Sequence, residues 1–463
     1  MSWKKASIHK LFNPESIAVI GASPRPESLG ALTFTALTKY SGKKYLVNPR
    51  YQQIGDMRCY KSVLDVPDEI DLAILALGAS HVLDVVRECA EKQAQSAIIF
   101  AAGFKELGGR GKKLQTELKR VANDGEIAVI GPNCLGAGNV RLDLNATFFP
   151  HPAPLENGSV SVISQSGGVS GLMLYRASEA GVGISKFASI GNRVNVDFND
   201  LLRYFRTDPE TKVVCLFVEG TGDARLMYEE MRKTTNEKDV VVYKVGKTPA
   251  SKKAALSHTG SLAGNATLYS AAFRQARAVE VDSIQEMMDS AKVLSVQMAS
   301  ERGKKVAVIT HSLGIALIAA QKLEQHGMHL PEPSPGTVTA IRNLLDMNVE
   351  IPVSNPVDLL AKGWAEPDVF AKAFDVVLND NTYDAILTVF SPNFQEGIGG
   401  GMPAQAVVDA KRGSNKPVVS VLNAPRSHVP HGKNVLEDGG IPTFASPERA
   451  AIALSTLLAG KTR

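Results

Sequence analysis

The sequence predicts an α/β protein built from parallel sheets that are covered by helices. Apolar stretches of strand length alternate with amphipathic stretches of helix length, and this alternation starts afresh twice along the chain. With 463 residues, 44% hydrophobic and 21% charged, the chain has the composition of an ordinary globular protein and is long enough for several domains. We therefore expect three successive α/β domains.

The first series of strands and helices ends near residue 150, where three prolines in FFPHPAPLENG interrupt the pattern. We expect the second domain to cover residues 151–300 and the third to cover residues 301–463. The expected strands of the first domain are SIAVIGAS (16–23), KKYLVNP (43–49), DLAILAL (71–77), SAIIFAAG (96–103) and IAVIGPN (127–133).

The third series resembles the second in three places that occur in the same order. Residues 159–169 (SVSVISQSGGV) align without gaps on residues 305–315 (KVAVITHSLGI). Further along, DVVVYKVG matches PVVSVLNA, and VEVDSIQEMMDSAKVLS matches PTFASPERAAIALSTLL. We therefore predict that the third domain is a repeat of the second.

Charge and cysteine content argue against several classes of protein. The net charge of +4 is spread along the chain, which gives no reason to expect a nucleic-acid partner. The four cysteines lie far apart, without the spacing of metal ligands, which is typical of reduced thiols, and we expect no metal site. No apolar stretch is long enough for a signal peptide or a membrane span, so we expect a cytoplasmic protein.

The first strand runs into the turn Gly21-Ala22-Ser23-Pro24, which should present backbone N–H groups to an anion at the start of a helix. An NAD-binding turn is disfavoured, because the next glycine is Gly30 and the second strand ends in Asn48 instead of an acidic residue. Coenzyme A fits better, and nearby cations are available for its phosphates: Arg25, Arg50 and Lys105. The alternative is that Gly21 only permits tight packing between strand and helix.

Two further turns are candidate phosphate sites. Ser164-Gln165-Ser166-Gly167-Gly168 joins a strand to a helix with hydroxyls and flexible backbone, and its repeat is Thr310-His311-Ser312. The two helix starts are expected to face each other across one phosphate, with His311 as a turn residue near it. Leu313 follows the second turn where a glycine would allow more backbone freedom, and simple capping of the helix by serine is the alternative.

His258 lies among hydroxyls and glycines in SHTGSLAG, a poor setting for core packing. A neutral imidazole accepts a phosphoryl group well near pH 7 when a hydrogen bond holds its other nitrogen. Glu219 ends an apolar strand at the sheet edge where ligands bind, so it is the candidate to orient the ring. The alternatives are a structural histidine and a solvated glutamate.

The chain as a whole resembles the ADP-forming acyl-CoA synthetases, relatives of the succinyl-CoA synthetase alpha subunit. The resemblance rests on FNPESIAVIGAS, YLVNPRYQQIGDMRCYKSVLDVP, AAGFKE and IAVIGPNCLGAGN, then on SQSGG, SHTGSLAG and NPVDLL. It implies a Rossmann-like CoA-binding domain over residues 1–150 and two flavodoxin-like domains of the succinyl-CoA synthetase type. The first of these, 151–300, would carry a phosphohistidine, and the second, 301–463, would be a ligase-like repeat.

The resemblance also implies roles for individual residues. His258 matches the phosphorylated histidine and Glu219 the glutamate that orients it. The residues implied for coenzyme A are Gly21, Ala22, Ser23, Pro24, Asn48, Arg50, Ala102, Gly103 and Phe104. Those implied for phosphate are Ser164, Gln165, Ser166, Gly167, Gly168, Thr310, His311 and Ser312.

The implied reaction interconverts acyl-CoA, ADP and phosphate with a carboxylic acid, CoA and ATP, through an acyl phosphate and a phosphohistidine. No ATP-grasp segment and no G-x-x-x-x-G-K-[ST] motif occurs in the sequence. The resemblance therefore points to a separate alpha subunit of the acetate–CoA ligase type, paired with an ATP-grasp beta subunit as α₂β₂. ADP or ATP and Mg²⁺ would bind to that subunit. The alternatives are a non-catalytic, regulatory CoA-binding protein of the same fold and an NAD-linked dehydrogenase; the acyl group is left open.

Overall fold

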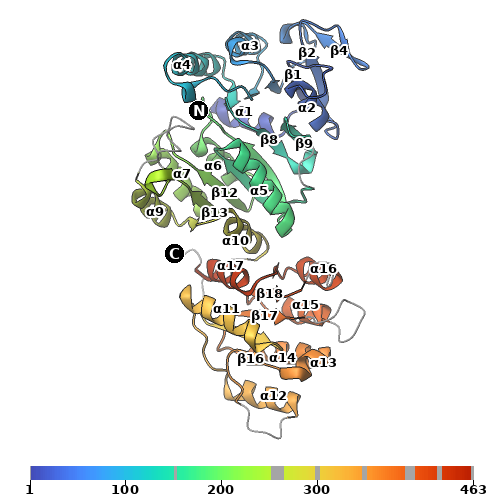
Figure 1. Cartoon of the computed structure of the whole chain (residues 1–463), viewed down its shortest axis with the longest axis vertical. Helices are drawn as coiled ribbons and strands as arrows, with labels where there is room; N and C mark the ends of the chain where they lie inside the picture. The colour runs from blue at the N-terminus through green and yellow to red at the C-terminus, as the bar shows by residue number, and fades with distance from the viewer. Residues whose placement is uncertain are drawn as a thin grey trace. The chain divides into compact units, whose positions relative to one another are not determined.

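The chain forms two compact units, Met1–Ala291 and Lys292–Arg463, and each is described here by itself. A computed structural model (Figure 1) describes residues 2–150, 154–251, 265–297, 303–346, 352–391, 402–424 and 430–459. Within these residues, no helix is both long enough and apolar enough to cross a membrane.

The first sheet has the strand order β3-β4-β2-β1-β5-β6-β7. The five predicted strands are all present and parallel: β1 (Ser16–Ile20), β2 (Lys43–Val47), β5 (Leu72–Leu75), β6 (Ser96–Ile99) and β7 (Ala128–Ile130). A short hairpin, β3 (Gln53–Ile54) and β4 (Met57–Tyr60), extends the edge next to β2. The helices of this part are α1 (Ser2–Phe12), α2 (Leu29–Ala36), α3 (Ala79–Glu91) and α4 (Gly109–Asp124).

Both faces of the first sheet are buried, as expected for parallel strands. Ile17 of β1 belongs to a core that contains Ile8 of α1. Its neighbour Ala18 points to the opposite face and belongs to a second core, which contains Val86 of α3. The continuous apolar character of these strands in the sequence follows from this double burial.

The second sheet has the order β14-β13-β12-β10-β11-β8-β9. Five of its strands are parallel: β10 (Asn157–Ser164), β11 (Ile184–Ser189), β12 (Val213–Val218), β13 (Asp239–Lys244) and β14 (Val279–Val281). Its helices are α5 (Gly167–Ala180), α6 (Phe198–Thr207), α7 (Ala224–Thr235), α9 (Ala266–Gln275) and α10 (Ile284–Val296), the last of which continues into the second unit.

The remaining two strands of this sheet come from the sequence range expected to form the first domain. β8 (Gly136–Asn139) pairs antiparallel with β11, and β9 (Leu144–Thr147) pairs antiparallel with β8. This hairpin covers β11, which would otherwise be an exposed edge strand. The three-domain division at residues 150 and 300 stays a prediction, but strand pairing passes to the second sheet before residue 150.

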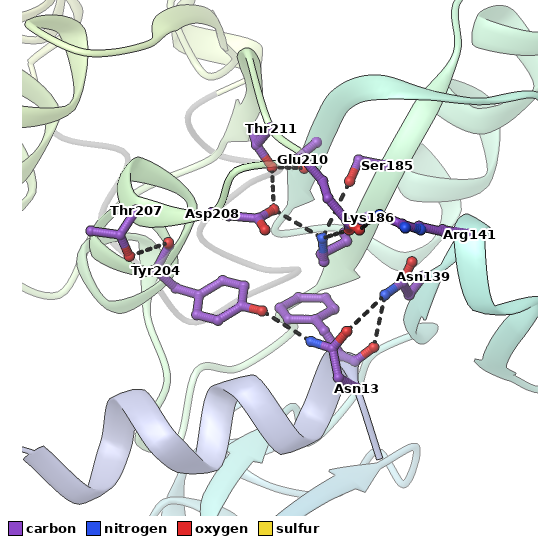
Figure 2. A network of polar contacts seen from close by, with 12 residues as sticks. Asn13, Asn139, Arg141, Ser185, Lys186, Tyr204, Thr207, Asp208, Glu210 and Thr211 are labelled. Atoms are coloured by element: carbon purple, nitrogen blue, oxygen red, sulfur yellow. Dashed lines mark hydrogen bonds and ion pairs between the residues drawn. The ribbon is translucent and has the colours of Figure 1, made fainter. Parts of the chain in front are cut away.

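A buried ion pair fastens β11 to the loop that precedes β12 (Figure 2). Lys186 is only 1% exposed, and its Nζ lies 2.9 Å from Asp208 Oδ2 and 2.5 Å from Glu210 Oε2. Arg141, in the connection between β8 and β9, also bonds Glu210. The edge hairpin is thus tied to the body of the second sheet by charge as well as by backbone pairing.

The end of α1 is tied to the same hairpin. Asn139 Nδ2 donates hydrogen bonds to Phe12 O at 3.0 Å and to Asn13 Oδ1 at 3.2 Å. Asn13 Nδ2 in turn donates to the hydroxyl of Tyr204 on α6 at 3.2 Å, and Figure 2 shows these side chains converging. The N-terminal helix therefore contacts both sheets of the first unit.

The second unit contains a five-stranded parallel sheet with the order β16-β15-β17-β18-β19. This is the order of β11-β10-β12-β13-β14 when β15 is matched to β10, which supports the proposed repeat. The strands are β15 (Val306–Thr310), β16 (Val357–Asp358), β17 (Ala385–Phe390), β18 (Val418–Leu422) and β19 (Thr443–Phe444). The helices are α11 (Leu313–Gln325), α12 (Pro335–Leu345), α13 (Leu360–Ala365), α14 (Pro367–Asn379), α15 (Ala404–Arg412), α16 (Pro430–Asp438) and α17 (Pro447–Ala459).

Candidate active site

The first glycine turn requires its glycine. Gly21 follows β1 with a φ of +93°, and a Cβ on this residue would lie 2.5 Å from Ala76 O. Its N–H donates to Val47 O of the adjacent strand at 2.9 Å. The turn is therefore held tightly at the end of β1, between the ends of β2 and β5, where the chain order reverses across the sheet and ligands bind in such folds.

Asn48 joins the second strand to this turn. Its Nδ2 donates to Ala22 O at 2.7 Å, and its Oδ1 accepts from the Arg50 N–H at 3.0 Å. The structure thus brings the predicted residues Gly21–Pro24, Asn48 and Arg50 together at one point of the sheet edge. Asparagine suits this role because it supplies a donor and an acceptor at once.

The loop Ala102-Gly103-Phe104 follows β6 at the same edge, separated from β1 by β5. Glu106 Oε1 accepts the N–H groups of Gly103 at 2.6 Å and Phe104 at 3.1 Å. The predicted CoA residues therefore occupy two places along one edge of the first sheet, and Glu106 fixes the second of them.

The turn Ser164–Gly168 has the geometry of an anion site. β10 ends at Ser164, α5 begins at Gly167, and Ser164 Oγ donates to Ser166 O at 2.8 Å. Ser166 occupies the N-cap position but its side chain makes no capping hydrogen bond to the helix. Helix capping by serine, the alternative weighed from the sequence, is therefore not what this hydroxyl does, and the first N–H groups of α5 remain directed away from the helix.

A cavity of about 560 Å³ opens beside this turn. Its aromatic residues form two edge-to-face pairs, Phe100 with Phe148 and Phe149 with Tyr175. The residues that line it are Phe100, Asn133, Cys134, Leu135, Phe148, Phe149, Gln165, Ser166, Gly167, Gly168, Gly171, Leu172, Tyr175, Gly191 and Asn192. The cavity thus offers hydrogen-bonding groups around the turn and an apolar wall for an uncharged substituent.

Glu219 lies directly after β12, at the carboxyl end of the strand, and is 8% exposed. Its N–H donates to Gln165 Oε1 at 3.0 Å, and its carbonyl oxygen accepts from Lys244 Nζ at 2.9 Å. The turn Ser164–Gly168 and the predicted orienting glutamate are therefore joined through Gln165. His258 lies outside the described residues.

Lys105 is a half-buried amine close to these groups. Burial and the neighbouring Arg193 guanidinium lower the pKa of Lys105 to about 8. The carboxylates of Asp197, Glu106 and Glu219 act in the opposite direction but do not restore the pKa to its ordinary value. The Lys105 amine at the edge of the site therefore changes its protonation state near pH 8.

The second predicted turn lies in the second unit. β15 ends at Thr310, α11 begins at Leu313, and Ser312 N donates to Thr310 Oγ1 at 2.8 Å without a side-chain cap on the helix. His311 Nε2 accepts from the Ser391 N–H at 3.4 Å, and burial lowers the pKa of His311, so that its ring is neutral at pH 7. The turn repeats the strand–turn–helix arrangement of residues 164–168.

Sequence reasoning missed several residues that line the cavity, among them Asn133, Gly191 and Asn192. They lie in the loops after β7 and β11, within the stretches IAVIGPN and SIGNRVN, and no local spacing marks them as site residues. Among the described residues, no group of three or more His, Cys, Asp or Glu side chains is placed to hold a metal ion.

Two family models match parts of the chain. Residues 15–139 match the CoA binding domain, and residues 157–294 match the succinyl-CoA ligase like flavodoxin domain. The predicted fold class is confirmed by these matches and by the parallel sheets. A solved structure of similar fold is the dinucleotide forming acetyl-coenzyme A synthetase 1 of Ca. Korarchaeum cryptofilum in complex with phosphate and ADP. Its TM-score is 0.87, with 30% identity, over 97% of this chain and 96% of that one.

Two relatives define the family more closely. The alpha subunit of the ADP-forming acetate–CoA ligase II of Pyrococcus furiosus is 35% identical over an alignment of 451 residues that covers 96% of each chain. The ADP-forming acetate–CoA ligase I of Archaeoglobus fulgidus is 36% identical over 97% of this chain, and the match spans 63% of that relative. The chain therefore belongs to the ADP-forming acyl-CoA synthetase family, in which it is similar throughout to an acetate–CoA ligase alpha subunit.

Proposed function

We propose that the chain is the alpha subunit of an ADP-forming acyl-CoA synthetase that interconverts acyl-CoA, ADP and phosphate with a carboxylic acid, CoA and ATP. The observation that carries this proposal is the cavity beside Ser164–Gly168, which is joined to Glu219 by the hydrogen bond that the Glu219 N–H donates to Gln165 Oε1. A phosphate held by the turn would lie beside the carboxylate expected to orient His258.

The proposed chemistry has three reversible steps. An oxygen of inorganic phosphate attacks the thioester carbonyl carbon, the C–S bond breaks, and CoA leaves with a proton as its thiol. A nitrogen of His258 then attacks the phosphorus of the acyl phosphate, and the carboxylate leaves as the P–O bond breaks. The phosphohistidine finally transfers its phosphoryl group to ADP, which restores the neutral imidazole.

The turn and Glu219 have different tasks in this scheme. The backbone N–H groups at the start of α5 and the hydroxyl of Ser166 stabilise the charge on phosphate and on the acyl phosphate. Glu219 accepts a hydrogen bond from the imidazole and stabilises the positive charge that develops when the ring nitrogen attacks. The turn Thr310-His311-Ser312 is proposed as a further phosphate-binding element.

Coenzyme A is proposed to bind at the edge formed by Gly21–Pro24, Asn48, Arg50 and Ala102–Phe104, within the range that matches the CoA binding domain. ADP or ATP and Mg²⁺ are proposed to bind to an ATP-grasp beta subunit in an α₂β₂ complex. The name of the Pyrococcus furiosus relative, an alpha subunit, supports a separate partner. The cytoplasmic location stays a prediction from composition.

The test is the transfer of labelled phosphate to the chain. The chain is incubated with [³²P]phosphate and acetyl-CoA in the absence of any beta subunit, and acid-labile label on the protein is measured. Wild type should become labelled, His258→Ala should not, and Glu219→Gln should be labelled more slowly. The matched control is His326→Ala, because His326 is exposed at the end of α11 and should leave labelling unchanged.

The same experiment separates the main proposal from the alternative of a non-catalytic CoA-binding protein. A purely regulatory chain binds CoA but takes up no label. Equal labelling of His258→Ala and wild type would place the phosphoryl group elsewhere and contradict the assignment. ATP formation from ADP should require addition of the beta subunit.

A further inference from the structure

We propose that Glu106 is a positioning residue that couples the CoA-binding loop to the phosphate cavity, so that binding of either ligand strengthens binding of the other. This inference rests on the proposed function. One oxygen of the Glu106 carboxylate accepts the N–H groups of Gly103 and Phe104, at 2.6 and 3.1 Å. The other accepts Nδ2 of Asn192 at 2.5 Å. A single carboxylate thus joins a loop of the first sheet to a wall of the cavity in the second.

Asn192 connects Glu106 to the cavity. It lines the cavity and is only 3% exposed. Its Nδ2 also donates to Gln115 Oε1 at 3.1 Å, so both amide hydrogens have acceptors and the orientation of the amide group is determined. Its position therefore depends directly on Glu106 and Gln115.

Gln115, on α4, provides a second connection between the same two regions. Its Oε1 accepts the N–H of Lys105 at 3.2 Å, and its Nε2 donates to Asn192 O at 3.3 Å. The loop of residues 102–106 and the loop that carries Asn192 are consequently linked by two side chains and by no direct backbone hydrogen bond that the described residues show.

Backbone hydrogen bonds hold the loop that carries Asn192 against the loop that follows β7. Asn192 N donates to Pro132 O at 2.8 Å, and Val194 N donates to Gly131 O at 3.0 Å. Gly191 has a φ of +51°, and a Cβ there would lie 2.4 Å from Pro132 O. A shift at Glu106 is therefore passed to the Asn192 side chain and not absorbed by the backbone around it.

The charge of Glu106 is maintained by the same contacts. Burial acts to raise its pKa, but the hydrogen bonds from Gly103, Asn192 and Phe104 outweigh that effect and lower the pKa below its ordinary value. The group is therefore a carboxylate at neutral pH, which accepts on both oxygens. An amide in its place can accept on only one of them.

Coupling follows from the order that each ligand imposes. A CoA molecule held by residues 102–104 favours the arrangement of this loop in which Glu106 is hydrogen-bonded to Asn192, and phosphate in the cavity favours the same arrangement. Because thermodynamic coupling is reciprocal, phosphate must strengthen CoA binding by the same factor. This coupling would increase the fraction of molecules that hold CoA and phosphate at the same time.

The test is calorimetric titration of the full chain with CoA, with and without saturating inorganic phosphate. In the wild-type chain, saturating phosphate should lower the Kd of CoA by at least about fivefold, the lower end of typical coupling. In Glu106→Gln, the ratio of the Kd without phosphate to the Kd with phosphate should fall to near one. The substituted amide has a similar volume, but either orientation turns its NH₂ group toward an existing donor, Asn192 Nδ2 or the Gly103 N–H.

The matched control is Glu117→Gln on α4, which makes the same chemical change at a carboxylate that pairs with Arg120 and Arg87 at the surface. It should keep the wild-type ratio. A second variant, Asn192→Ala, should also lose the effect of phosphate, and the double variant Glu106→Gln/Asn192→Ala should lose no more than either alone. If one single variant is unstable, the other single variant still tests the connection by itself.

Three outcomes would overturn the inference: no effect of phosphate on wild type that does bind CoA, an undiminished effect in Glu106→Gln, or additive losses in the double variant. A wild-type chain that binds no CoA at all is a different result. It would contradict the proposed CoA site, and therefore the proposed function itself.

Discussion

Gln165 accepts a hydrogen bond from the backbone N–H of Glu219 at 3.0 Å, and this bond joins the turn Ser164–Gly168 to the end of the neighbouring strand β12. The same oxygen accepts the Gly220 N–H at 3.1 Å. Gln165 is 3% exposed, so water does not substitute for it. The side chain between the two serines of SQSGG thus positions the residue expected to orient His258.

Replacement of Gln165 should therefore affect stability and activity together. Gln165→Ala leaves two buried N–H groups without their acceptor, each at a cost of about 1–3 kcal/mol. We expect a lower free energy of unfolding, and phosphate labelling from acetyl-CoA that is slower than in wild type under conditions where both chains are folded. Chemical denaturation and the labelling assay measure the two effects. Gln95→Ala, at an exposed glutamine, is the control; a Gln165→Ala chain as stable as wild type would contradict the role.

Loss of Lys186 should destabilise the first unit strongly. Lys186→Met leaves Asp208 and Glu210 without their buried cation, and breaking a buried ion pair in this way costs about 3–5 kcal/mol. Hydrogen exchange of the β11 amides and urea denaturation measure the loss. Arg120→Met removes two ion pairs at the surface of α4, with Glu117 and Asp124, and should have no measurable effect. Similar behaviour of the two variants would show that the buried network is not needed.

Acid should weaken the second unit through Asp380. Burial acts to raise the pKa of this carboxyl, but hydrogen bonds from the N–H groups of Thr382 and Ser334 lower it far below its ordinary value. A group with a lowered pKa stabilises the fold above its unfolded pKa of about 3.9, and this contribution is lost as the pH falls below that value.

Asp380→Asn should therefore reduce the stability of the second unit at pH 7, and the difference from wild type should shrink at pH 3. Urea denaturation of both chains at the two pH values measures this. Asp409→Asn, at an exposed ion pair on α15, is the control and should show no such change. A constant difference between Asp380→Asn and wild type at both pH values would contradict the linkage.

Much of the architecture could be predicted from local sequence. The strands around Ile17, Leu72 and Ile98 are buried on both faces, so their apolar runs stand out clearly. The turns after β1, β10 and β15 were recognisable because glycines and hydroxyl residues interrupt the apolar pattern where a strand ends. The fold class and the family follow from these local signals.

The contacts between the two sheets of the first unit could not be predicted in the same way. Glu106 and Asn192 are 86 residues apart, and nothing in AAGFKE or SIGNRVN indicates that they form a hydrogen bond. The pairing of the β8–β9 hairpin with β11 was not predicted, because strand pairing over long sequence distances depends on topology and not on local pattern. The prediction for His258 falls outside the described residues and stays a prediction.

The hairpin of β8 and β9 has a consequence for how the N-terminal module of this chain is exchanged with that of a relative. A chimaera joined at residue 150 would carry foreign strands into the second sheet, with a foreign partner for Lys186 and Glu210 at its edge. With a junction between Pro132 and Leu135, all strands of the first sheet come from one parent protein and all strands of the second sheet come from the other. The suitable junction for such a chimaera therefore lies just after β7, before the β8–β9 hairpin and not at the proline-rich segment near residue 150.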